Sequence, residues 1–344
     1  MQISLAPMEG VIDHQMRQLL TSIGGYDRCV TEFIRVTVNP VPAKVFRRLC
    51  PELDHGGVTP SGVPVYVQLL GGNAELMARS AVTACNIGAR GIDINFGCPA
   101  KIVNRHDGGS VLLRQPDRIH AIVAQVRDRV DPDIPVCAKI RLGYDNSNYL
   151  DEIVAAVDAA GADELCIHAR TRMDGYKPPA YWAHIGNLAT TKNTRLIVNG
   201  EIWNAGDARQ ARQQSGCRDL MIGRGGLARP DLARIIRADL DSGGAHYQPM
   251  SWPEVAALVD HFFHQQDSRI PKYVGNRTKQ WLAYLKRQYP GAESLFKTIK
   301  RYRDFSEISG LIRQHRRQIE KKPMASPTLG DRLTAPGSPL QLAQ

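Results

Sequence analysis

The sequence predicts an α/β protein, a (β/α)₈ TIM barrel followed by a small helical domain. Short β-rich runs alternate with helical patterns, and eight such runs over roughly 240 residues match the usual size of this barrel. The turn after the first run reads A-P-M-E-G, whereas a doubly wound sheet often carries G-x-G-x-x-G there and usually has fewer strands. We therefore favour the barrel over the doubly wound alternative.

The predicted strands are short apolar runs that end in turn or polar residues. They are Ile3–Pro7, Arg28–Glu32, Val63–Leu69, Gly91–Asn95, Pro135–Arg141, Glu164–His168, Arg195–Asn199 and Asp219–Ile222. Helical patterns lie between them. They are Glu75–Asn86, Pro116–Arg129, Asp151–Ala160, Asn204–Ser215 and Pro230–Asp239.

A break at Gly243–Gly244 separates the barrel from a second, helical region. We assign residues 1–243 to the barrel domain, 250–321 to a helical domain and 322–344 to a disordered tail. The tail contains four prolines and few large apolar groups, so it cannot bury enough surface to fold. The helices expected in the second domain are Trp252–Gln265, Val274–Gln288, Ala292–Lys300 and Phe305–Ile319.

The composition is that of an ordinary soluble globular protein, with 43% hydrophobic and 23% charged residues. No run approaches the ~18 apolar residues of a membrane span, and the N-terminus lacks the basic segment of a signal peptide. The seven cysteines form no C-x-x-C pair and none has zinc-ligand spacing. We expect a cytoplasmic monomer without a metal or a disulfide framework, in which most thiols, such as Cys166, fill the core.

Basic residues give the chain a formal net charge of +10. A basic excess alone is a weak signal, because it can serve solubility. Here the excess is concentrated after Arg269, where acidic residues are few. The predicted helical domain is therefore suited to a polyanionic partner such as a nucleic acid.

The stretch G-I-D-I-N-F-G-C-P-A-K at 91–101 carries the clearest chemical signal. A short apolar strand breaks at Asn95, Gly97 and Pro99, and the loop that follows presents Cys98. A cysteine at the carboxyl end of a barrel strand is typical of a catalytic residue. For a single thiol the alternative is a buried structural cysteine.

The other predicted strands also end in polar residues. Because barrel sites are built at the carboxyl ends of the strands, so many polar ends favour a site there. These ends carry Pro7-Met8-Glu9, Gln68, Lys139, Arg141, His168, Arg170, Asn199-Gly200-Glu201 and Gly223-Arg224-Gly225-Gly226.

The last two strand ends favour a phosphate-bearing cofactor. Gly200 and Gly223 allow close approach of the backbone to an anion, and Arg224 adds a fork of donors. Lys139 would suit the N1/O2 edge of a flavin, and Gln68 has the amide groups to hold its pyrimidine edge. His168 would approach the phosphate or the ring. For each of these residues a purely structural role remains the alternative.

Motifs spread over most of the chain resemble those of the tRNA-dihydrouridine synthases, most closely the C subfamily that acts on uridine 16 in the D-loop of tRNA. The motifs are A-P-M-E-G-V-I-D, T-E-F-I-R-V, V-Q-L-L-G, D-I-N-F-G-C-P-A-K, K-I-R-L-G, H-A-R-T, V-N-G-E-I-W and M-I-G-R-G. The runs G-E-I-W and R-x-K-Q-W-L indicate the subfamily. The resemblance runs from Leu5 to about Lys300 and implies a TIM barrel that carries FMN, with a small helical domain.

Position by position, the resemblance makes Cys98 the general acid. It implies FMN contacts for Pro7, Met8, Glu9, Gln68, Lys139, His168, Asn199, Gly200, Glu201, Gly223 and Arg224.

The resemblance also implies residues that contact the substrate. Asn95 and Arg141 would face the target nucleotide, and Arg35, Arg277, Lys279, Tyr284 and Lys300 match positions that hold the tRNA. Lys300 stands where the subfamily tends to have arginine. A lysine there cannot make the bidentate contacts that an arginine makes with a phosphate or a base. The glycine-rich turn after the cysteine loop is also altered, reading R-H-D-G-G-S at 105–110.

The resemblance implies reduction of the uracil C5–C6 double bond in tRNA, with NADPH as reductant and FMN as hydride carrier. One alternative is an FMN barrel that acts on a free small molecule, as in dihydroorotate dehydrogenases. A second alternative is a tRNA-binding or tRNA-folding protein without catalysis. The basic helical domain and the cysteine loop favour the tRNA-modifying enzyme.

Overall fold

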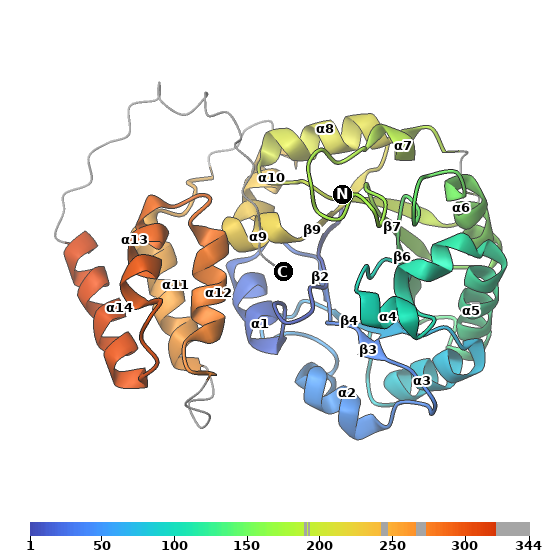
Figure 1. Cartoon of the computed structure of the whole chain (residues 1–344), viewed down its shortest axis with the longest axis horizontal. Helices are drawn as coiled ribbons and strands as arrows, with labels where there is room; N and C mark the ends of the chain where they lie inside the picture. The colour runs from blue at the N-terminus through green and yellow to red at the C-terminus, as the bar shows by residue number, and fades with distance from the viewer. Residues whose placement is uncertain (189–190, 192, 242–246, 266–272, 321–344) are drawn as a thin grey trace.

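A closed barrel of parallel strands forms the larger part of the molecule (Figure 1). The computed structural model describes residues 1–320 except 189–190, 192, 242–246 and 266–272. Neighbouring strands run in the order β2-β1-β9-β8-β7-β6-β5-β4, and β2 also pairs with β4, which closes the barrel. The strands are β1 (Ile3–Leu5), β2 (Arg28–Val30), β4 (Val65–Leu70), β5 (Ile92–Asn95), β6 (Val136–Arg141), β7 (Glu164–His168), β8 (Arg195–Asn199) and β9 (Asp219–Ile222).

The predicted TIM barrel is confirmed, and each of the eight expected strands is present. One further strand was not predicted: β3 (Ile34–Arg35), which extends the edge of β4. Two residues are too few for a period-two pattern to show in the sequence, so β3 carries no signal of its own.

Helices surround the outside of the barrel (Figure 1). Several were not predicted. Asp13 caps the first of them by accepting from the Met16 N–H at 2.9 Å, but an arginine on its buried face interrupts the apolar pattern. The helices are α1 (His14–Ile23), α2 (Ala43–Leu49), α3 (Ala74–Asn86), α4 (Lys101–Arg105), α5 (Pro116–Arg129), α6 (Leu150–Ala159), α7 (Ala183–Gly186), α8 (Ala205–Ser215), α9 (Arg224–Ala228) and α10 (Leu232–Asp241), with 3₁₀ turns at Pro51–His55 and Gly109–Arg114.

Small and medium side chains fill the middle of the barrel. The Cys166 sulfur on β7 lies 3.4 Å from the Met221 sulfur on β9, and these strands are not neighbours, so the contact crosses the interior. The Cys166 thiol is core filler, as predicted, and burial raises its pKa to about 12. The interior cluster comprises Ala6, Val30, Cys166, Ile197 and Met221.

Four helices form a group beside the barrel (Figure 1). They are α11 (Trp252–Gln265), α12 (Asn276–Leu285), α13 (Pro290–Ile299) and α14 (Phe305–Glu320), close to their predicted bounds. Their core includes an edge-to-face contact of Phe262 with Trp281, whose ring centroids are 5.3 Å apart. The division into two domains stays a prediction, and the predicted tail at 322–344 lies outside the described residues. No helix in the described part of the chain is long and apolar enough to cross a bilayer.

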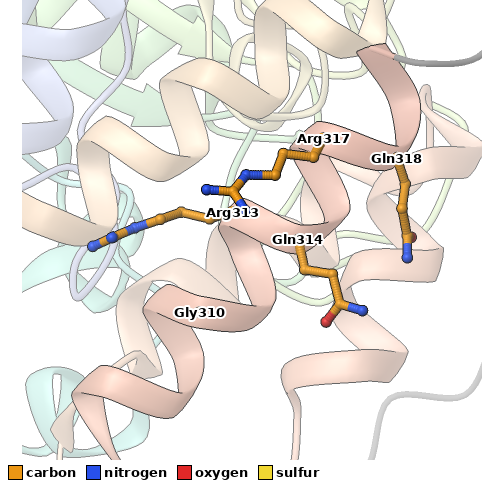
Figure 2. A pocket seen from close by; sticks show the side chains of 5 residues that line it. All are labelled: Gly310, Arg313, Gln314, Arg317 and Gln318. Atoms are coloured by element: carbon orange, nitrogen blue, oxygen red, sulfur yellow. The ribbon is translucent and has the colours of Figure 1, made fainter.

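Helix α14 forms the outer edge of this group, away from the barrel (Figure 1). Its exposed face has a shallow hollow of about 440 Å³ (Figure 2). Gly310, two arginines (Arg313 and Arg317) and two glutamines line this hollow, so its side chains present hydrogen-bond donors and positive charge. The hollow lies on the helical group and does not belong to the barrel mouth.

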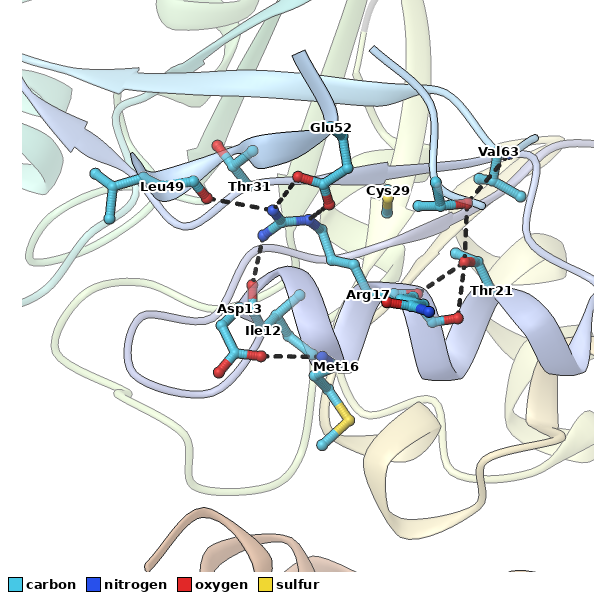
Figure 3. A network of polar contacts seen from close by, with 12 residues as sticks. Ile12, Asp13, Met16, Arg17, Thr21, Cys29, Thr31, Leu49, Glu52 and Val63 are labelled. Carbon is cyan, nitrogen blue, oxygen red and sulfur yellow. Dashed lines mark hydrogen bonds and ion pairs between the residues drawn. The ribbon is translucent and has the colours of Figure 1, made fainter. Parts of the chain in front are cut away.

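A buried ion pair fastens α1 to the turn that follows α2 (Figure 3). The Arg17 guanidinium, which is fully buried, donates to both carboxylate oxygens of Glu52 at 2.8 Å. It also donates to the carbonyls of Ile12 at 2.9 Å and Leu49 at 3.3 Å, so its donors are well used. Burial by itself raises the pKa of Glu52, but Arg17 more than offsets this and the pKa lies below its ordinary value.

Replacing Arg17 by methionine should destabilise the protein by about 3–5 kcal/mol, because Glu52 would be left buried and unpaired. Urea denaturation at pH 7 measures this loss. Arg47→Met is the matched control: Arg47 pairs with Asp54 in the same region, but both side chains are half exposed, and its loss should cost under about 1 kcal/mol.

The same pair sets a pH dependence. Since the folded-state pKa of Glu52 is lowered, its contribution is present above the ordinary glutamate pKa and is lost as pH falls through the lowered value. If Arg17→Met and Arg47→Met lowered the free energy of unfolding equally, the stabilising role assigned to the buried Arg17–Glu52 pair would be wrong.

Candidate active site

The strand register gathers the polar strand ends into one inward-facing band. Gln68 on β4 is paired with Asp93 on β5, and Asn95 on β5 with Lys139 on β6. Further round the barrel, His168 on β7 is paired with both Arg141 on β6 and Asn199 on β8. Partners across parallel strands point to the same face, so these side chains share the barrel interior at its carboxyl end.

A chain of amide contacts leads from this band to the cysteine loop. The Gln68 side-chain NH₂ donates to the Asp93 carboxylate at 2.6 Å, and the Gln68 Oε1 accepts from the Asn95 side-chain NH₂ at 2.8 Å. The Asn95 Oδ1 then accepts from the backbone N–H groups of Gly97 and Cys98, both at 2.9 Å. Asn95 is therefore occupied in shaping the loop, and its predicted contact with a nucleotide stays a prediction.

Cys98 lies at the mouth, where the residue as a whole is 9% exposed. Burial is the main cause that raises the pKa of this thiol, and the Glu9 carboxylate adds to it, while Arg35 and Arg141 oppose it. The thiol therefore stays protonated at neutral pH. That state suits a proton donor and does not suit a nucleophile.

The segment at 104–110 packs against the Cys98 loop and hydrogen-bonds to its backbone. Ser110 N–H and the Asn104 amide both donate to the Cys98 carbonyl, at 3.1 Å. Gly109 has a φ of 66°, and a Cβ there would lie 2.8 Å from the Cys98 carbonyl oxygen. The turn at 105–110, which departs from the family pattern, thus carries a glycine that the cysteine loop requires.

Arg141 on β6 joins two loops of the mouth, the loop after β5 and the loop after β7. Its guanidinium is 2% exposed and donates to the carbonyls of Gly97 at 2.8 Å, Thr171 at 3.1 Å and Gly175 at 2.9 Å. These acceptors lie in the loops after β5 and β7. The predicted contact of Arg141 with the target nucleotide stays a prediction, and in this structure the residue positions the cysteine loop.

Positive charge collects around one buried imidazole. Burial lowers the pKa of His168 well below its ordinary value, and Arg141, Lys139, Arg170 and Arg224 lower it further. Lys139 donates to Asn199 at 3.0 Å, and Asn199 donates to the Met221 carbonyl at 2.8 Å. His168 is therefore neutral while cations surround it.

The loop after β8 supplies a carboxylate, that of Glu201, which forms ion pairs with two of these arginines. Glu201 pairs with Arg170 and, at 3.4 Å, with Arg224, and accepts from the Trp203 indole at 2.9 Å. Its backbone has a φ of 56°, which a glutamate adopts only where its surroundings hold it. The preceding Gly200 has a φ of 116°, and a Cβ there would lie 2.7 Å from the His168 ring.

These residues fit a phosphate-bearing cofactor. The Nη1 of Arg170 is buried and has no acceptor among the described residues, so an anion would satisfy it. Gly223, which precedes α9, faces Ala6 and Met8 on the loop after β1, and a Cβ added to it would be in ordinary contact with both at 3.7 Å. The predicted cofactor set from Gln68 to Arg224 is brought together at one end of the barrel, with Pro7, Met8 and the exposed Glu9 on the loop after β1. No cluster of possible metal ligands occurs in the described residues.

The residues predicted to contact tRNA differ in exposure and in the hydrogen bonds that their side chains already make. Arg35 and Lys300 are exposed, while Tyr284 on α12 is half-buried and burial raises its pKa. Lys279 donates to the Tyr302 carbonyl within the helical group. Arg277, in contrast, donates four hydrogen bonds through both terminal nitrogens of its guanidinium, and three of these four hydrogen bonds go to the loop after β1. Their roles stay predictions.

Several residues of the mouth were not predicted from the sequence. Tyr176, 55% exposed, lies within cation–π distance of Arg141 and Arg224, with guanidinium-to-ring distances of 5.1 and 5.0 Å. Trp203 lies under Arg224 at 5.3 Å. Both stand in irregular loops, where no periodic pattern marks them. Asp93 could have been predicted from the sequence. It lies two residues before Asn95 in the same strand, and alternation places both side chains on the inward face.

Comparison with known proteins agrees with this site. The family model described as dihydrouridine synthase matches residues 4–318. The chain belongs to the dihydrouridine synthase family. The resemblance seen in the motifs is therefore confirmed at the level of the family.

Relatives named tRNA-dihydrouridine(16) synthase match nearly the whole chain. The protein from Pseudomonas putida is 47% identical over 313 residues, which cover 91% of this chain and 96% of that protein. The protein from Shewanella oneidensis is 47% identical over 322 residues, covering 93% and 100%. A solved 2-naphthoyl-CoA reductase complex has a TM-score of 0.51 at 14% identity, over 68% of this chain and 49% of that one, and shares the fold.

In this dihydrouridine synthase family member, Gly109→Ala should displace the Cys98 loop. We expect turnover to fall by about 100-fold, since a shift of about 1 Å in a reacting group has such an effect. Gly62→Ala is the matched control, because Gly62 has a φ of 82° but nothing within 4 Å of an added Cβ. Both variants carry the backbone strain, and only Gly109→Ala moves the thiol. Steady-state rates and melting temperatures of the two variants separate these effects.

Proposed function

We propose that this protein reduces the C5–C6 double bond of a uridine in tRNA to give 5,6-dihydrouridine, at position 16 of the D-loop. The observation that carries the proposal is the protonated, loop-borne Cys98 beside a cation-rich mouth suited to a phosphate-bearing flavin. The family and the names of the relatives support the same reaction and substrate. Its cytoplasmic location and monomeric state stay predictions.

When bound, FMN reduced by NADPH would supply the hydride that C6 of the uracil receives. Arg224 and the buried Nη1 of Arg170 would hold its phosphate. Lys139 and Gln68 would hold the polar edge of its ring, with Asn199 fixing the ammonium group of Lys139. Pro7, Met8 and Glu9 would contact it from the loop after β1.

Cys98 acts as the proton donor to C5. Its raised pKa keeps the proton on sulfur at neutral pH, and the contacts of Asn95 with the Cys98 N–H and of Ser110 with its carbonyl fix the backbone. Hydride addition at C6 leaves negative charge on the uracil carbonyls until that proton arrives. A cation of the mouth, Lys139 or Arg141, lowers the energy of this charge across a short distance in a poorly hydrated pocket.

The uracil base must leave its stack to reach the thiol, at a cost of a few kcal/mol. Tyr176 is an exposed aromatic ring at the mouth and offers a surface on which an extruded base can stack. The exposed cations Arg35 and Lys300 offer charge for the phosphates, and α14 presents Arg313 and Arg317 further out (Figure 2).

Cys98→Ala should slow the reoxidation of pre-reduced flavin by tRNA by about 10²–10⁴-fold, because it removes the general acid. Stopped-flow absorbance at the flavin band follows the reaction. In the wild type the rate should fall as pH rises through the raised pKa of Cys98, because only the protonated thiol donates. In the alanine variant this alkaline decline should vanish.

Flavin content and tRNA affinity should be nearly unchanged in Cys98→Ala, which makes them the control. Reoxidation by tRNA at the wild-type rate would rule out the assigned role of the thiol. A yellow protein that reduces a free pyrimidine and ignores tRNA would support the dihydroorotate dehydrogenase-like alternative.

Lys300→Ala should weaken tRNA binding equally for all tRNA sequences and reduce the slope of log K against log salt concentration by about 1. Lys300 is exposed, so its charge is available to a phosphate. Lys297→Ala is the control on the same helix, since Lys297 is exposed but already paired with Glu293 at 2.8 Å. Filter binding from low to moderate salt measures both. Identical slopes in the two variants would remove Lys300 from the contact surface.

A further inference from the structure

Helix α12 and the turn after it contact the barrel mouth at three separate points. Arg277, Trp281 and Tyr284 recur at helical spacing and so share the face of α12 that looks toward the barrel. Arg287 lies in the turn after the helix, which ends at Leu285. Three of these residues reach three different loops, and each of those loops carries residues assigned above to the cofactor.

The first contact is made by Arg277 with the loop after β1. Its guanidinium donates to the Gly10 carbonyl, to the Val11 carbonyl at 2.6 Å and to the Asp13 carboxylate at 2.8 Å. In the same loop the N–H groups of Val11 and Ile12 close a turn onto the Met8 carbonyl, at 3.0 and 2.9 Å.

The loop is held at its other side as well. The Gly10 N–H donates to Glu32, and Ile12 accepts from the buried Arg17. Arg277 is the contact that comes from outside the barrel. Removing the Arg277 guanidinium would leave one side of the segment that presents Pro7, Met8 and Glu9 without its hydrogen bonds to α12.

The second and third contacts reach the loops after β9 and β8. The Trp281 indole, 1% exposed, donates to the Leu227 carbonyl of α9 at 3.1 Å, four residues after Gly223. Arg287 lies over the Trp203 ring at 4.2 Å, and the Trp203 indole donates to Glu201 at 2.9 Å. Through Trp203 and Glu201, Arg287 is joined to Arg224 and Arg170.

We propose that α12 acts as a splint across the three cofactor loops, and that Arg277 is a positioning residue for FMN although it does not touch the cofactor. This inference rests on the proposed function, since it requires FMN at the barrel mouth. It gives the helical group a second role beside tRNA binding. It also reassigns Arg277, whose two terminal guanidinium nitrogens donate within the protein, from the tRNA surface to the barrel mouth.

The test compares Arg277→Gln with Lys279→Gln in the full-length holoenzyme. A glutamine side chain at position 277 cannot make the fork, whereas Lys279 lies two residues along α12 and donates to the Tyr302 carbonyl away from the barrel. The FMN dissociation constant should rise at least about tenfold in Arg277→Gln. Loss of a residue that orients direct ligands has an effect of this size in metal sites. The fluorescence of flavin released on serial dilution measures the constant. It should change less than about twofold in Lys279→Gln.

Two further variants separate positioning from general destabilisation. Arg277→Lys keeps the charge and one donor and should recover part of the affinity. Asp13→Asn keeps the cap of α1, because asparagine caps as well as aspartate, but removes the ion pair. If the contact acts locally, the double variant Arg277→Gln with Asp13→Asn should lose less affinity than the sum of the two single losses.

The outcomes distinguish the two proposals. A wild-type protein that retains no FMN would defeat the proposed function and this inference with it. A wild-type protein that holds FMN, with Arg277→Gln holding it equally well, would overturn the splint alone. Should Arg277→Gln lack a cooperative unfolding transition, Arg277→Lys and Asp13→Asn decide: unchanged FMN affinity in both would also overturn it.

Discussion

The pairing of β2 with β4 is the constraint on which the rest of the structure depends. It closes a parallel sheet into a barrel, so every strand ends at the same rim, and each loop after a strand meets its neighbours there. Alternation then decides which side chains point inward. Because the registers align Asn95 with Lys139 and Arg141 with His168, polar groups from distant parts of the chain become neighbours in one band.

The band carries more positive than negative charge around His168. Arginine and lysine side chains surround a neutral His168, Glu201 meets two of them, and one guanidinium N–H of Arg170 is buried without an acceptor in the described chain. Holding like charges together in a poorly hydrated site costs free energy that the fold must supply. An anion bound there recovers part of it, which links the occupancy of the site to the stability of the loops.

The helical group and the barrel mouth are parts of one assembly. The loop after β1 is held by Arg17 from α1 and by Arg277 from α12, and the loops after β8 and β9 are held through Trp203 and Leu227. If α12 also contacts tRNA, as predicted for Lys279 and Tyr284, one helix would serve both the substrate and the proposed cofactor site. Binding at one of these sites would then affect binding at the other, because both would depend on the position of α12 at the mouth.

The sequence by itself determined the strands, most of the long helices and the positions of Cys98, Lys139, His168 and Arg224 at strand ends, because alternation, capping and turn residues are local signals. It could not reveal β3, which is too short for a pattern, or Tyr176 and Trp203, which stand in irregular loops. Nor could it show what Asn95, Arg141 and Arg277 do. Their side chains are long or bifunctional, and their partners are chosen among groups brought near by folding: Asp13 lies 264 residues from Arg277 in the chain. Only the closed barrel and the docked helices decide such pairings, because hydrogen bonds depend on distance in space.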